Sequence, residues 1–173
     1  MTTQTLLHKI PENTSLFQSR KYTFVFPTMP FLNYMIQSVA LPRIGTSAPV
    51  QSSPFADLHR HGDKLQYDPI TITCLLDEDL RVWEETHNWL VALTKPQMFP
   101  QYFRNSNGKQ TGYHDAILTI NNNANIPNIR IKFTNCHPLD VSSIALDTTV
   151  NADVAQTVDF QFRYDWFEIQ RLT

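Results

Sequence analysis

The sequence predicts a mainly β fold, an antiparallel β-sandwich or barrel with one flanking α-helix at about residues 78–93. Apolar and polar residues alternate with a period of two in segments spread from residue 20 to the C-terminus, which is typical of half-buried strands. One stretch instead places its apolar residues at helical spacing. The 173 residues are 42% hydrophobic, enough for one sizeable core. We therefore expect one domain over residues 1–173, with an N-terminal arm over residues 1–20.

Two strands are expected early in the chain. Tyr22, Phe24 and Phe26 alternate with smaller residues before a proline ends the run. A second extended stretch follows over residues 34–41 and ends at Pro42, because proline cannot donate to a strand ladder.

Further strands are expected after residue 69, joined in one place by an asparagine-rich turn at residues 121–125. A short one is expected over residues 141–146. The core-facing rows of the others are Ile70, Ile72, Cys74 and Leu76; Ala116, Leu118 and Ile120; Ile129, Ile131 and Phe133; and Val158, Phe160, Phe162, Tyr164 and Trp166. Cys74 and Cys136 have no metal-ligand spacing and are interpreted as buried thiols, while the sequence leaves open whether they ever pair.

The helix is expected to begin at about residue 78, where the acidic cluster at residues 77–79 supplies an N-cap candidate and a favourable charge at the positive end of the helix dipole. It is expected to end at Lys95-Pro96. Leu80, Trp83 and Leu90 fall near one face at helical spacing, and they are the predicted core contacts of this helix.

Two connections, over residues 45–62 and 97–112, exceed the usual loop length. The first carries apolar side chains that a solvated loop has no reason to carry, so it is predicted to be an intersubunit arm that a neighbouring protomer covers and that becomes rigid only on assembly. The predicted arm residues are Val50, Phe55, Leu58, His59, Arg60 and His61.

No enzymatic motif is convincing. His59 and His61 have the spacing of a metal-chelating pair, but the other histidines complete no ligand set. The sequence has neither a Gly-x-Ser-x-Gly elbow nor a glycine-rich phosphate loop. We therefore expect no catalytic residues, no metal and no cofactor.

Charge and hydropathy exclude other classes. The net charge of -2 disfavours a dedicated DNA-binding protein. The apolar stretches are too short to cross a bilayer, and the N-terminal residues lack the apolar segment of a secretion signal, so we expect no membrane association and synthesis in the cytosol.

Taken in order, three segments carry a resemblance to a known family. The first is VALP at residues 39–42, before the long connection. The second is GDKLQYDPITIT at residues 62–73, followed by LDED at residues 76–79 and the helix. The third is the pair IRIKFTNCHPLDV at residues 129–141 and VDFQFRYDW at residues 158–166. Their order and spacing over residues 20–168 resemble the tail tube proteins of contractile-tailed bacteriophages, which are similar in fold to the Hcp proteins of type VI secretion.

That resemblance implies a structural virion protein. Its protomers would close into hexameric rings whose joined hairpins line a channel, and the rings would stack into a tube through which DNA passes without specific binding. The implied partners are further copies of the chain, the tail sheath protein, and baseplate and neck proteins. The N-terminal arm and residues 98–112 depart from the common pattern, so a tube initiator or terminator ring protein is the alternative. A carbohydrate-binding β-sandwich module is the alternative from another class.

Overall fold

The computed structural model describes residues 14–94, 97–98, 112–149 and 154–172. The protein is mainly β, with antiparallel pairing throughout its described strands and one main helix, which confirms the predicted fold class. Most of the second long connection, residues 97–112, lies outside the described residues.

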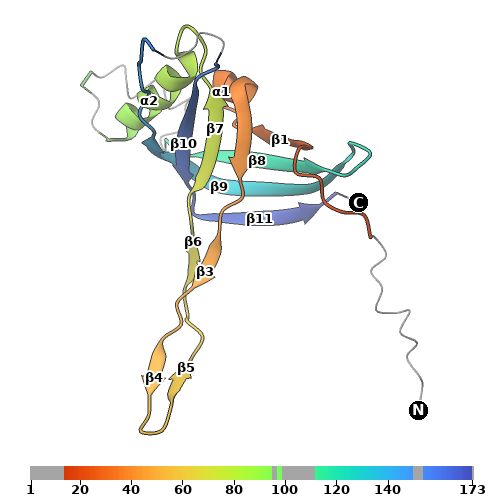
Figure 1. Ribbon diagram of the computed structural model, residues 1–173, viewed down its shortest axis with the longest axis vertical. Coiled ribbons are helices and arrows are strands. Elements are labelled where there is room, and N and C mark those ends of the chain that lie inside the picture. Colours follow the sequence, from red (N-terminus) through yellow and green to blue (C-terminus); the bar gives the residue numbers. More distant parts are fainter. Residues whose placement is uncertain (1–13, 95–96, 99–111, 150–153, 173) are drawn as a thin grey trace.

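Two groups of strands meet at one long, bent strand (Figure 1). The first sheet has the order β1-β8-β9-β11, and its strands are β1 (Tyr22–Val25), β8 (His114–Asn121), β9 (Pro127–Val141) and β11 (Trp166–Arg171). The second sheet pairs the end of β9 with β10 (Thr157–Arg163), β10 with β7 (Ile70–Leu75), and β7 with β2 (Ile36–Ala40).

Strand β9 changes sheets at Asn135. The β8–β9 register shifts between His114 and Ala116, opposite this residue, and Asn135 has a φ of 57°. Asparagine tolerates this left-handed conformation better than most residues. Two carboxylates hold the bend: the Asn135 backbone N–H donates to Asp115 Oδ1 at 3.2 Å, and its side-chain amide donates to Asp165 Oδ2 at 2.7 Å. The bulge therefore bends β9 and lets one strand serve both sheets.

A short helix, α1 (Pro30–Met35), precedes β2. The prediction of an extended chain from residue 34 is therefore wrong for residues 34–35, although β2 confirms the extended stretch after them. Pro30 occupies the start of α1, where a missing N–H costs nothing. Asn33 fixes the approach of the chain, because its side chain accepts from the Phe26 N–H and donates to the Phe26 carbonyl, both at 2.7 Å.

The main helix, α2 (Arg81–Thr94), confirms the predicted helix but begins at residue 81 instead of about residue 78. Asp77 accepts hydrogen bonds from the backbone N–H groups of Arg81 at 3.1 Å and Val82 at 3.4 Å, and so caps the helix. The core-facing residues are Val82, Thr86 and Trp89.

The predicted core face of α2 is therefore displaced by one position. Leu80 is exposed, so its prediction as a core contact is wrong. Trp83 and Leu90 are half-buried at the flank of the buried stripe, and the Trp83 ring stacks on His87. Leu80 has a φ of 53° and lies outside the helical path, so α2 starts only at Arg81, and Val82 is its first buried residue.

Two strand predictions are also corrected. Val141 is the last residue of β9, and residues 142–147 form no strand. The final alternating run is divided at residues 164–165, and Trp166 starts β11 with its side chain 52% exposed. Trp166 pairs with Thr134 in β9, whereas Val158, Phe160 and Phe162 face the core from β10. Tyr164, just after β10, is also buried in the core.

The core lies between α2 and the two sheets, and aromatic rings fill its centre. The Phe26 ring lies 5.2 Å from Phe24 and 4.8 Å from Phe162, between centroids. Cys74 and Cys136 are both buried, as predicted, and both are free thiols; burial raises the pKa of each thiol to about 12. Both thiols are therefore protonated and unreactive at neutral pH.

Candidate assembly surfaces

The connection predicted as an arm is a long β ribbon that projects from the body of the protein (Figure 1). At its base β3 (Ile44–Thr46) pairs with β6 (Leu65–Tyr67), and farther out β4 (Val50–Ser52) pairs with β5 (Asp57–His59). We call residues 44–67 the ribbon. The sequence showed no alternation here, so its pairing was not predicted.

The tip of the ribbon is closed by local hydrogen bonds. The Ser53 N–H donates to the Ala56 carbonyl at 3.2 Å, and Ser52 Oγ donates to Asp57 Oδ1 at 2.8 Å. Between the two paired regions, a Cβ added at Gly62 would lie 2.1 Å from the Ser47 carbonyl oxygen. Only glycine fits there, because the two chains approach more closely than any side chain allows.

The six predicted arm residues are all exposed in the ribbon. Phe55 at the tip is 99% exposed, and Val50 and Leu58 are exposed behind it. A two-stranded ribbon is only marginally stable in water, and this one exposes five large apolar side chains instead of burying them: Ile44, Val50, Phe55, Leu58 and Leu65. Within the described residues, the chain itself does not cover these apolar side chains, so the ribbon resembles an element that binds another molecule.

The histidine pair lies on this ribbon, His59 at the end of β5 and His61 just after it. Within the ranges that the structure describes, no group of three or more His, Cys, Asp or Glu side chains is placed to hold a metal ion. That this segment carries no chemistry stays a prediction.

The solvent face of the first sheet carries apolar side chains, among them Val25 and Trp166, beside charged ones whose signs balance. In one cross-strand row Lys132 stands between Ile117 and Glu168, and its Nζ lies 2.9 Å from Asp115 Oδ2. Hydrogen bonding to Asp115 raises the pKa of Lys132, so this side chain stays charged and neutralised by its neighbour. The next row adds Arg130, beside neutral partners.

Strands β1 and β11 are the two edges of the first sheet, and β2 is an edge of the second, within the described part of the chain. Exposed edges present unpaired backbone groups and favour pairing with another chain. Because β1 and β11 are different strands, pairing between them in two copies would be heterologous and would extend the sheet around a ring.

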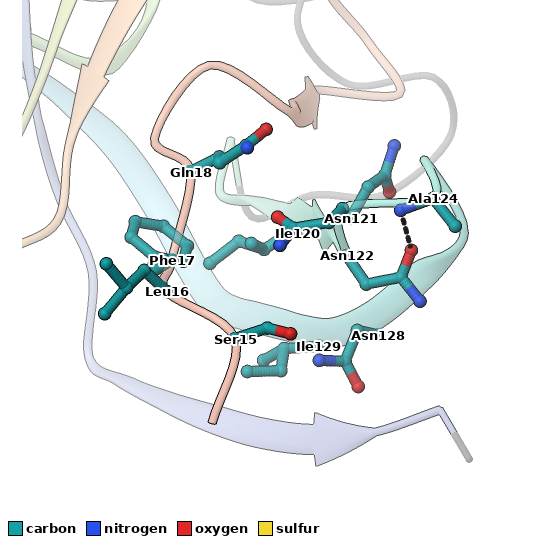
Figure 2. A pocket seen from close by; sticks show the side chains of 11 residues that line it. Ser15, Leu16, Phe17, Gln18, Ile120, Asn121, Asn122, Ala124, Asn128 and Ile129 are labelled. Atoms are coloured by element: carbon teal, nitrogen blue, oxygen red, sulfur yellow. Dashed lines mark hydrogen bonds between the residues drawn. The ribbon is translucent and has the colours of Figure 1, made fainter. Parts of the chain in front are cut away.

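A hollow of about 400 Å³ lies beside this sheet, between the segment of residues 15–18 and the turn that joins β8 to β9 (Figure 2). Asparagine amides line one side, and Leu16 and Phe17 line the other. Asn122 Oδ1 accepts from the Ala124 N–H at 2.9 Å and so shapes the turn. None of the lining residues is charged.

Sequence reasoning missed two features of these surfaces. Strand β11 was read as the end of β10, because the alternation runs through residues 164–165 almost unbroken. Helix α1 is too short for a periodic signal, although proline at its first position is a known start signal. Met29, the N-cap residue of α1, makes no side-chain hydrogen bond to the helix. Instead the Glu85 carboxylate of α2 accepts a hydrogen bond from the Leu32 N–H at 3.3 Å.

No protein-family model matches the sequence, and no curated protein matches it. Solved structures do match. The chain is similar, with a TM-score of 0.65 and 12% identity, to a chain in the structure of the anti-feeding prophage tube terminating cap, covering 96% of this chain and 99% of that one. It is similar, with a TM-score of 0.60 and 12% identity, to a chain of the sheath-tube complex of an extracellular contractile injection system, PVC, covering 92% and 94%. A chain of the anti-feeding prophage baseplate matches with a TM-score of 0.58 and 10% identity, covering 91% and 97%.

These likenesses extend over nearly the whole length of both chains, and they show the fold. The protein has the tube-like fold of contractile tail and injection assemblies, as the sequence resemblance implied. Separately, no helix in the described ranges is long and apolar enough to span a bilayer.

Proposed function

We propose that this chain is a structural, non-catalytic protomer of a contractile tail, which closes into hexameric rings that stack as the tail tube. The observation that carries this proposal is the combination of a tube-like fold with surfaces that are incomplete in one copy: the ribbon with Phe55 at its tip, and the free edges of the first sheet. Residues 1–173 would then form one tube-like domain.

Ring closure would use the edges β1 and β11. Joining these strands around six copies would make one continuous sheet, which removes every exposed edge of the first sheet. The face with Lys132, Asp115 and Glu168 would then line the channel. Lys132 stands beside Asp115 and Glu168, and Arg130 stands beside neutral partners, so two carboxylates offset two cations and a polyanion would meet no net positive charge in these rows. This supports passage of DNA as the cargo.

The proposed partners follow from the same arrangement. Further copies contact the sheet edges and the ribbon, a sheath protein surrounds the tube, and baseplate and neck proteins meet its ends. The protein would be made in the host cytoplasm and would act in the tail of the virion.

A second candidate is a tube terminator, a ring that ends the tube and meets a different protein on its far side. The likeness to a chain of a tube terminating cap favours it. The two candidates differ in how far assembly proceeds, because a terminator stops after one ring whereas a tube protomer continues.

Shortening the ribbon tests the proposal. We expect a variant with residues 47–60 replaced by a short glycine-serine bridge to remain a folded β protein by circular dichroism and to form no tubes in electron micrographs. Tubes of normal length from this variant would show that the ribbon is not an intersubunit element.

A further inference from the structure

Two neighbouring strands change sheets at the same place. Strand β9 crosses at the Asn135 bulge: before the bulge it pairs with β11, and after the bulge it pairs with β10. The strand beside it crosses at residues 164–165, which separate the end of β10 from the start of β11 (Figure 1). The last residue of β10 pairs with His137 and the first residue of β11 pairs with Thr134, so the two crossings lie side by side.

One side-chain hydrogen bond joins the two crossings, and we call it the tie. The side-chain amide of Asn135 donates to Asp165 Oδ2 at 2.7 Å, and the Asp165 N–H donates to the Thr134 carbonyl at 3.1 Å. The preceding residue is anchored on the other side, since Tyr164 is buried and its hydroxyl donates to the Asp68 carbonyl at 3.1 Å. Asp165 is therefore the residue at which the chain begins to follow β9 as β11.

The same asparagine also contacts β8. Its backbone N–H donates to Asp115 Oδ1 at 3.2 Å, and Asp115 Oδ2 lies 2.9 Å from Lys132 Nζ. Asn135 thus connects β8, β9 and the start of β11 through its own backbone and side chain. It does so from a left-handed conformation, with a φ of 57°, which asparagine and aspartate adopt more readily than other residues except glycine.

The tie lies at the start of an edge that the proposed ring uses. Within the described residues β11 pairs with β9 alone, so its other side is free. A strand that is held on one side only separates most easily at its ends. Pairing with the next copy requires a free edge with a fixed direction, because ring closure depends on the rotation from one copy to the next.

The tie contributes less to the core than to this edge. Asn135 and Asp165 are both exposed, so water competes for their hydrogen bond and its contribution to global stability is small. The neighbouring core residues Phe133 and Cys136 are buried without help from either side chain. Loss of the tie should therefore loosen the start of β11 and leave the sandwich folded.

We infer that Asn135 is a positioning residue for assembly: by holding Asp165, its side-chain amide fixes the start and the direction of the β11 edge with which the next copy in the ring pairs. This inference rests on the proposed function. The effect of Asn135 on ring closure acts through β11.

An exchange of the two side chains tests the inference. Asn135→Asp keeps the shape of the side chain and tolerates the left-handed conformation, but a carboxylate cannot donate to Asp165 and repels it. The double variant Asn135→Asp, Asp165→Asn restores one donor and one acceptor with their positions exchanged, at the net charge of wild type. The matched control is Asp165→Asn alone, because its side-chain oxygen still accepts from Asn135.

Three measurements are made on each variant: ring formation in electron micrographs, the thermal unfolding midpoint, and hydrogen exchange of the amides at residues 165–168 in dilute, unassembled protein. Asn135→Asp should form few rings and exchange these amides about tenfold faster, as expected for the loss of one hydrogen bond to a charged group. Its midpoint should fall by only about 2 to 4 °C. The double variant should regain rings and slow exchange, and the control should assemble like wild type.

A glycine variant separates the tie from the bend. Asn135→Gly keeps the left-handed conformation without the amide, so it should assemble as poorly as Asn135→Asp. Normal assembly of Asn135→Gly would assign the effect to the bend of β9 and overturn the inference.

Other outcomes would also overturn it. Wild-type numbers of rings from Asn135→Asp, or unchanged exchange at the start of β11, would show that the tie does not position this edge. A midpoint more than about 10 °C below wild type, with no recovery in the double variant, would show that Asn135 supports only the fold. Wild-type protein that forms no rings would instead remove the proposed function, and the consequence for ring closure with it, whatever the exchange rates are.

Discussion

Truncating Trp89 should destabilise the protein far more than truncating Trp83, six residues earlier on the same helix. Trp89 is 4% exposed, and its ring lies 5.9 Å from both Phe26 and Phe162. Its Nε1 donates to the Gly112 carbonyl at 2.7 Å. Trp83 is half-buried and stacks on His87 at 4.9 Å.

The size of the effect follows from these contacts. Removing a buried tryptophan side chain costs about 3 to 5 kcal/mol, and the lost hydrogen bond adds about 1 kcal/mol. For a chain of this length each kcal/mol lowers the midpoint by about 2 to 4 °C, so Trp89→Ala should unfold about 10 to 20 °C below wild type. Trp83→Ala loses mainly one exposed ring stack, worth about 0.5 to 1.5 kcal/mol, and should fall by only a few degrees.

Thermal unfolding followed by circular dichroism measures both variants under identical conditions. If Trp89→Ala is too unstable to purify, Trp89→Phe keeps part of the ring and should give an intermediate midpoint. Equal losses from the two alanine variants, or a larger loss from Trp83→Ala, would refute the assignment of the buried face of α2.

Three further predictions concern the ribbon, a buried carboxylate and the thiols. Gly62→Ala should abolish tube formation without lowering the thermal unfolding midpoint of the protein. The control is Gly45→Ala, where an added Cβ meets open space, and this variant should assemble normally. Equal assembly of the two variants in micrographs would contradict the close approach of Gly62 to Ser47. Desolvation raises the pKa of Glu85, so the folded protein binds a proton at this carboxylate more tightly than the unfolded chain does. The contribution of Glu85 to stability therefore falls as the pH rises through its pKa in the folded protein. Glu85→Gln should therefore raise the midpoint at pH 7 and lose that advantage toward pH 4, and an advantage that is independent of pH would count against this cause. Cys74 and Cys136 should resist alkylation at pH 8 in the native protein and react once it is unfolded, and rapid labelling of either native thiol would show that it is not buried.

Much of the fold could be predicted because strands with one solvent-exposed face alternate strictly between apolar and polar residues. The rows of β7 and β8 follow the sequence pattern residue by residue. The face of α2 could not be fixed to one position, since it depends on where the helix begins, and Leu80 adopts a conformation that a leucine pattern does not reveal. The division between β10 and β11 is likewise set by the bulge at Asn135 and its two carboxylate contacts, which are distant in sequence.

The assembly surfaces could be predicted from the sequence only where apolar side chains occur in an otherwise polar connection. Phe55 and Leu58 in a polar connection indicated an interaction element.

Electron micrographs of the purified full-length protein test the central claim most directly. A structural tube protomer should form six-fold rings that stack into hollow tubes. A protein that remains monomeric across the concentration range in which tubes are sought, with no rings, would contradict the account.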